Sequence, residues 1–129
     1  MALKRNLGSF PKALWLAHLA RRWGADHIHA YWASGAASLA MVAGAAEGVP
    51  WSFTAHRWDI AQPNALRAKV ESARFVRFIS QDGLELARGV AGPKLGEKAA
   101  LIRMGVPLSD LALQATPRPP GVDLRLVCT

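Results

Sequence analysis

The stretch WSFTAHRWDI, residues 51–60, decides how the rest of the chain can fold. Its first five residues favour an extended strand, and the run then stops on a histidine, an arginine, a tryptophan and an aspartate. An apolar strand with polar groups at its carboxyl end is typical of open parallel sheets, whose ligands bind in the crevice beyond the strand ends. The stretch therefore predicts a strand at Trp51–Ala55 and places His56 and Asp59 in a ligand site.

The length and composition indicate one folded domain. The chain has 129 residues, of which 51% are hydrophobic and 19% charged, as is ordinary for a globular protein. Its 16 Lys and Arg against 9 Asp and Glu give a net charge of +7, which favours a phosphate-bearing partner: nucleic acid, anionic lipid or a nucleotide-type ligand. The basic residues are spread along the chain rather than interleaved with aromatics in one stripe, which argues against nucleic acid.

Cysteine usage and the N-terminal segment predict a cytoplasmic protein. Cys128 is the only cysteine, so no internal disulfide can form, in keeping with a reducing compartment. Lys4 and Arg5 precede an apolar segment, but Pro11 and His18 interrupt it, and no signal peptide is expected.

The sequence also predicts peripheral contact with the inner face of the membrane. The most apolar region, residues 36–46, is well short of the roughly 20 residues that span a bilayer. Arg21 and Arg22 lie on an amphipathic helical pattern, which suits contact with a membrane surface.

Helix-like and strand-like stretches alternate along the chain. Pro11 marks the start of a helix that Gly24 ends, and Ser80 is expected to cap a later helix. This alternation predicts an α/β fold with a parallel sheet and helices on both faces. The expected helices are 10–23, 36–47, 64–73 and 81–90, and the expected strands are 26–32, 51–55, 74–80 and 99–103. The positions expected to form the apolar face of the first helix are Leu16, Leu19, Ala20 and Trp23.

The carboxyl ends of the strands should meet at one edge of the sheet, because the crossovers between parallel strands are right-handed. At that edge His56 could reach a sugar hydroxyl or a phosphate. Gly35 opens a helix whose N–H groups suit an anion, and Arg103 either offers a cation to a phosphate or simply ends a strand. The candidate substrate-binding residues are Ser34, Gly35, Arg57, Asp59, Ser80, Arg103 and Gly105.

Two interpretations stay open at the histidines. Asp59 either orients His56 or caps the following turn. His27 and His29 alternate onto one strand face and, together with His56, suggest a zinc site. No cysteine lies nearby and a fourth ligand is missing, so hydrogen-bonded or packed histidines are the simpler interpretation and no metal site is predicted.

Four blocks in this order resemble the N-terminal domain of family 4 glycosyltransferases, which have the GT-B fold. The resemblance covers about residues 10 to 110 and implies a Rossmann-like parallel sheet. The matching blocks are residues 27–33, 48–60, 73–80 and 102–106.

The resemblance implies a retaining transferase that moves a sugar from a nucleotide-sugar donor to a lipid-linked or polysaccharide acceptor. No metal or other cofactor is obligatory in this family, and the N-terminal domain mainly receives the acceptor. His56 matches the histidine of the family's Thr-x-His block and is expected to act in catalysis, near the reacting carbon of the donor sugar. Arg103 and Gly105 match the segment that leads to the second domain.

The chain departs from the family pattern at several places. Tyr31 stands where a third histidine is common, and Pro107 where an aspartate is common. The resemblance predicts a partial N-terminal domain at residues 1–115, a Pro-rich linker at 116–121 and the first strand of a truncated second domain at 122–129. We therefore expect a chain that is inactive alone. The alternatives are a non-catalytic basic α/β module that binds an anionic partner and, third, a metal-binding module.

Overall fold

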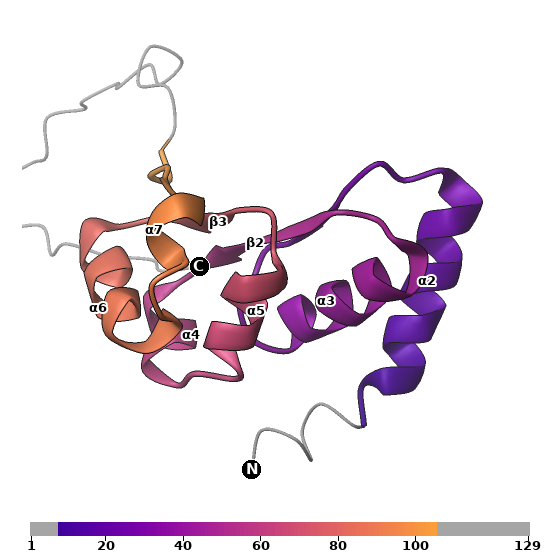
Figure 1. Cartoon of the computed structure of the whole chain (residues 1–129), viewed down its shortest axis with the longest axis horizontal. Helices are drawn as coiled ribbons and strands as arrows, with labels where there is room; N and C mark the ends of the chain where they lie inside the picture. The colour runs from indigo at the N-terminus through magenta and orange to yellow at the C-terminus, as the bar shows by residue number, and fades with distance from the viewer. Residues whose placement is uncertain (1–7, 106–129) are drawn as a thin grey trace, which may run out of the picture.

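The computed structural model describes residues 8–105 (Figure 1). The linker and the second-domain strand predicted beyond residue 115 lie outside these residues. The helices are α2 (Phe10–Trp23), α3 (Gly35–Glu47), α4 (Arg57–Ala61), α5 (Leu66–Ser72), α6 (Gln81–Ala91) and α7 (Leu95–Lys98). The strands are β1 (Ile28–Ala30), β2 (Trp51–Ala55), β3 (Val76–Phe78) and β4 (Ala99–Leu101).

The four strands form one parallel sheet in the order β1-β2-β3-β4. Phe53 in the middle of β2 lies opposite Ala30 on one side and Val76 on the other. The predicted α/β class with a Rossmann-like parallel sheet is confirmed. Three of the strands are shorter than predicted, whereas β2 has the predicted bounds.

One face of this sheet carries the hydrophobic core. Phe53, Val76 and Phe78 are fully buried there, and residues of α3, α4, α5, α6 and α7 pack against them. Neighbouring strands follow one another in the chain, so right-handed crossovers place every connecting helix on the same side. The expectation of helices on both faces is therefore wrong for residues 8–105, where they cover one face only. Within residues 8–105 the opposite face of the sheet carries mainly polar side chains, among them His29 and Arg77.

Helix α2 lies at one end of the molecule, at the right of Figure 1, and packs against α3 rather than joining the sheet core. Its bounds and its end at Gly24, with φ of 62°, are as predicted. The predicted apolar face is only partly right, because Trp23 is 75% exposed. Small side chains face α3 instead, since they let the two helices approach closely; they are Ala13, Ala17 and Ala20.

Two short helices stand where the sequence predicted loops and turns. Helix α4 follows directly on His56, and α7 precedes β4. Local patterns missed both because helices of four or five residues show too little periodicity to be recognised.

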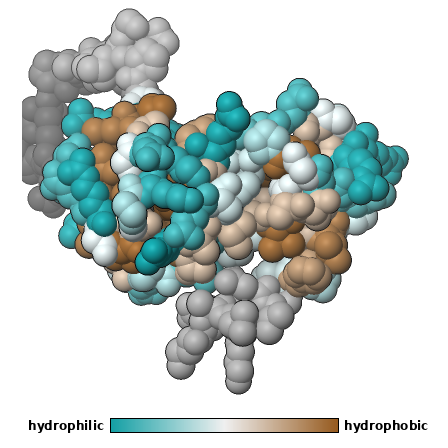
Figure 2. All heavy atoms as spheres, viewed as in Figure 1, coloured by the Kyte–Doolittle hydropathy of each residue, from teal (hydrophilic) through white to brown (hydrophobic). Residues whose placement is uncertain are grey.

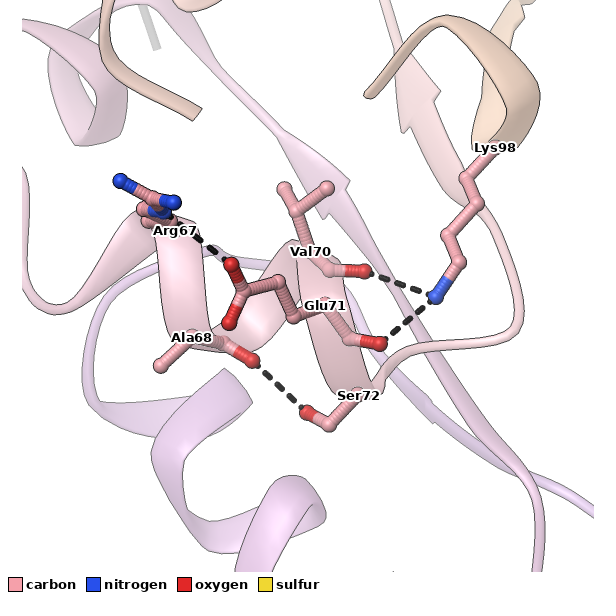
Figure 3. Close-up of polar contacts among 6 residues, drawn as sticks. All are labelled: Arg67, Ala68, Val70, Glu71, Ser72 and Lys98. Atoms are coloured by element: carbon pink, nitrogen blue, oxygen red, sulfur yellow. Dashed lines mark hydrogen bonds and ion pairs between the residues drawn. The ribbon is translucent and has the colours of Figure 1, made fainter. Parts of the chain in front are cut away.

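The carboxyl end of α5 is closed by a lysine from α7 (Figure 3). The Lys98 ammonium donates to the carbonyls of Val70, Glu71 and Ala73 at 3.0, 2.8 and 2.7 Å. These carbonyls belong to the last turn of α5 and its C-cap, where helical partners are lacking. Arg67 and Glu71 add an ion pair on the same helix, at 3.0 Å. Lys98 therefore joins α7 to the carboxyl end of α5.

Candidate functional site

A pocket of about 380 Å³ opens beyond the carboxyl ends of β1 and β2. We call it the tip pocket. The structure brings three of the predicted site residues together in its lining: Ser34, Gly35 and Asp59. The other lining residues are Trp32, Trp58, Gln62 and Asn64.

Asp59 holds the backbone that frames the tip pocket. Its side chain is buried, and Oδ2 accepts from the N–H of His56 at 3.4 Å and from the N–H of Ala33 at 3.2 Å. Asp59 is the third residue of α4, so its bond to the His56 N–H closes the start of that helix. Of the two roles considered for Asp59, these contacts fit the cap, because they are made with backbone and not with the imidazole.

Lys69 is a residue of this region that sequence reasoning missed. Its side chain is fully buried, and Nζ donates to the carbonyls of Ala33 and Ser34, both at 2.7 Å. Burial lowers its pKa to about 8, although the charge of Asp59 acts in the opposite direction. The signal in the sequence was its spacing, since positions 66, 69 and 70 share the inward face of α5.

His56 is held in one orientation at the end of β2. Its Nε2 lies 3.1 Å from the carbonyl oxygen of Tyr31, which can only accept, so Nε2 carries the proton of this bond. The ring stacks on Trp32 with centroids 4.1 Å apart and meets Tyr31 at 5.3 Å in a tilted arrangement. The His56 side chain also accepts from the backbone N–H of Asp59 in a capping box, which engages the second ring nitrogen, Nδ1.

A second, more open pocket of about 490 Å³ includes Tyr31 in its lining, and we call it the arginine pocket. Its lining residues are Tyr31, Arg77, Arg103, Met104 and Gly105. Trp32 lines the tip pocket and Tyr31 the arginine pocket, and His56 touches both of these residues. His56 itself lines neither pocket, but it contacts one lining residue of each.

Besides His56, two predicted site residues line neither pocket. The hydroxyl of Ser80 accepts from the N–H of Gly83 at 3.2 Å and caps α6, as the sequence predicted for that helix start. Arg57 is the exposed first residue of α4 and lines neither pocket.

The other histidine pair forms a hydrogen-bonded group on the polar face of the sheet. Ser52 Oγ lies 2.7 Å from His27 Nε2 and 2.7 Å from His29 Nδ1, and His29 Nε2 lies 3.0 Å from Thr54 Oγ1. Both rings stack on Phe75. Across the described residues, no three His, Cys, Asp or Glu side chains are grouped so that they could hold a metal ion.

Burial lowers the pKa of His29, and the charges of His27 and Arg77 add to this effect. The neutral imidazole is therefore favoured in the folded chain.

The family described as "Glycosyl transferase 4-like domain" matches residues 2–113. No curated protein and no solved structure gives a significant match to this chain. Within residues 8–105, no helix has the length and apolar character needed to cross a bilayer.

Proposed function

Because the chain belongs to the glycosyl transferase 4-like domain family and is a glycosyltransferase-type domain that serves a sugar donor and an acceptor, we propose a specific transfer reaction. In this proposal the sugar moves from a nucleotide-sugar to a lipid-linked or polysaccharide acceptor with retention of configuration. The observation that carries it is the contact of His56 with Trp32 of the tip pocket and with Tyr31 of the arginine pocket.

We assign a role in this reaction to His56 and to the groups near it. The donor sugar lies beside the His56 ring, which the Tyr31 carbonyl and the backbone N–H of Asp59 hold in one orientation. The N–H groups at the start of α3, after Ser34 and Gly35, favour the negative charge of the donor phosphates. Lys69 acts as a positioning residue for the segment 33–35, and Asp59, which lines the tip pocket, holds the same segment.

The bond changes need no redox partner. The bond from the anomeric carbon to the donor phosphate breaks, a bond from that carbon to the acceptor oxygen forms, and the acceptor hydroxyl proton passes to the departing phosphate. Contact of the sugar with the fixed His56 ring holds the reacting carbon in position during this exchange. We propose that the nucleotide-sugar is a substrate and that no further cofactor takes part.

We also propose that the protein acts in the cytoplasm, in peripheral contact with the inner face of the membrane through α2. Arg21 is engaged with Glu47 in two bonds, at 2.6 and 2.8 Å, so Arg22 and Lys12 are the basic groups left for lipid phosphates. Trp15 is 61% exposed and suits the bilayer interface. Figure 2 shows apolar surface over the lower part of α2 and hydrophilic surface at its upper end.

A transfer assay on the full-length protein that the gene encodes tests the proposal. The protein is incubated with a panel of labelled nucleotide-sugars and a membrane lipid or polysaccharide fraction, and NMR of the product gives the anomeric configuration. Label in the acceptor fraction with retained configuration is the expected result. Anion binding without transfer to any acceptor would favour the non-catalytic basic module instead.

A further inference from the structure

The arginine pocket has an excess of positive charge that no group of the described chain neutralises. Arg77 from β3 and Arg103 from the segment after β4 both line it, and no carboxylate does. Both ion pairs present in residues 8–105 lie elsewhere, at Arg21 with Glu47 and at Arg67 with Glu71. Two guanidinium groups that share a pocket repel each other unless an anion lies between them.

The Arg77 guanidinium is held in place for such an anion. Its Nε donates to the carbonyl of Ile102 at 3.1 Å, which leaves its two terminal nitrogens as donors. The side chain is half-buried, so less of its charge is screened by water than at an exposed arginine. Planar guanidinium groups bind phosphate and carboxylate oxygens in a bidentate manner.

Tyr31 offers a third donor in the same pocket. Its hydroxyl donates to Met104 Sδ at 3.7 Å, and a thioether is a weak acceptor that an anionic oxygen can replace. Tyr31 also touches His56 through its ring and its carbonyl, which places the anion beside the proposed reacting centre.

We propose that Arg77, Arg103 and Tyr31 form an anion site that binds a phosphate or carboxylate group of the sugar acceptor. The assignment to the acceptor rests on the proposed function, whereas the binding of the anion rests on the pocket alone. An acceptor recognised here carries its negative charge close to the hydroxyl that receives the sugar, as in a phosphate-linked lipid or a polysaccharide with acidic sugars.

Binding of small anions to the 129-residue chain tests the site without any transfer reaction. Inorganic pyrophosphate represents a phosphate-linked acceptor, and glucuronate represents an acidic sugar. NMR signals of the arginine Nε–Hε groups report which side chain is touched. We expect saturable shifts at Arg77 and Arg103 with at least one of the two anions, weakened by added salt.

Single variants assign the binding to the pocket. Arg77→Gln and Arg103→Gln should each weaken the anion about tenfold or more, as expected for the loss of a charged hydrogen bond. Arg88→Gln, on the exposed side of α6, is the matched control and should bind as the wild type does. If Arg77→Gln does not fold, the exposed Arg103 provides the same test.

The outcomes separate the two anions and the two proposals. Binding of pyrophosphate alone identifies a phosphate-bearing acceptor, and binding of glucuronate alone identifies an acidic sugar. No saturable shift with either anion, or an equal loss in Arg88→Gln, would overturn the site. If the protein binds the anion but shows no transfer activity, the proposed function is wrong and the anion site is still supported.

Discussion

The ammonium group of Lys69 lies 2.7 Å from the carbonyl oxygen of Ala33, 36 residues earlier in the chain. Asp59 binds the N–H of the same alanine at 3.2 Å, so the backbone of Ala33 is held on both sides by buried side chains. Ser34 and Gly35, which follow Ala33 directly, line the tip pocket. The two bonds to Ala33 therefore fix the backbone at the edge of this pocket. A lysine and an aspartate with opposite charges thus fix one short loop.

Lys69→Met should destabilise the chain while leaving the apolar volume nearly unchanged. The Ala33 carbonyl would lose its bond to Lys69 in a buried place, at an expected cost of about 1 to 3 kcal/mol in the free energy of unfolding. Urea unfolding measures the change. Lys94→Met, at an exposed position, is the control and should stay close to the wild type. An equal effect in both variants would contradict the role given to Lys69.

Acidification should destabilise the fold through His29. Its pKa is lowered in the folded state, so the unfolded chain takes up a proton first as the pH falls below the ordinary value of 6.5. The stability contribution is thus present above that value and lost as the pH falls through the folded pKa. Unfolding free energies at about pH 7.5 and about pH 5 should differ less in His29→Gln than in the wild type. His18→Gln, on exposed α2, should keep the wild-type difference.

His56→Ala should impair transfer and leave folding almost intact. The Asp59 bond at this position is made to the backbone N–H, which alanine keeps. Loss of one preorganised contact near the reacting carbon should lower the transfer rate by on the order of 10²-fold or more. The full-length protein is assayed together with Arg88→Ala as control, and thermal melting checks the fold. A rate within a factor of about two of the wild type would remove His56 from the reaction.

Transfer should persist in the presence of a strong chelator. The proposed reaction uses His56 and the donor phosphates without a bound metal, and His27 and His29 are engaged with Ser52. Activity of the full-length protein before and after EDTA, with zinc or magnesium added back, is the measurement. Loss of activity that zinc restores, and that His27→Ala abolishes, would instead support the metal-binding interpretation.

Trp15→Ala should weaken binding to vesicles that contain anionic lipid. The indole is on the face of α2 away from α3, near Lys12 and Arg22, so it can enter the bilayer interface without disturbing the core. Flotation or tryptophan fluorescence with vesicles of anionic and of zwitterionic lipid measures the effect. Leu86→Ala, an exposed apolar position on α6, is the control. Equal binding to both kinds of vesicle would contradict a role for the basic residues.

Much of the fold could be predicted from local sequence, because helix caps and strand-forming runs are recognisable within a few residues. Gly24 and Gly48 end their helices in the left-handed conformation that glycine adopts without strain. Ser80 caps α6 as its position predicted, and β2 spans the predicted residues. The gathering of Ser34, Gly35 and Asp59 at one edge followed from the alternation of strands and helices.

By itself, the sequence determined the α/β class, the parallel sheet and the edge at which the strand ends meet. Only the tertiary structure decided which buried polar groups meet, because such partners lie far apart in the chain and no local pattern encodes them. Lys69 donates to the carbonyl of Ala33, and Arg77 lines one pocket with Arg103. Strand order and helix packing bring both pairs together. The inward face of α2 was decided in the same way, since close approach to α3 favours alanine over the larger apolar side chains.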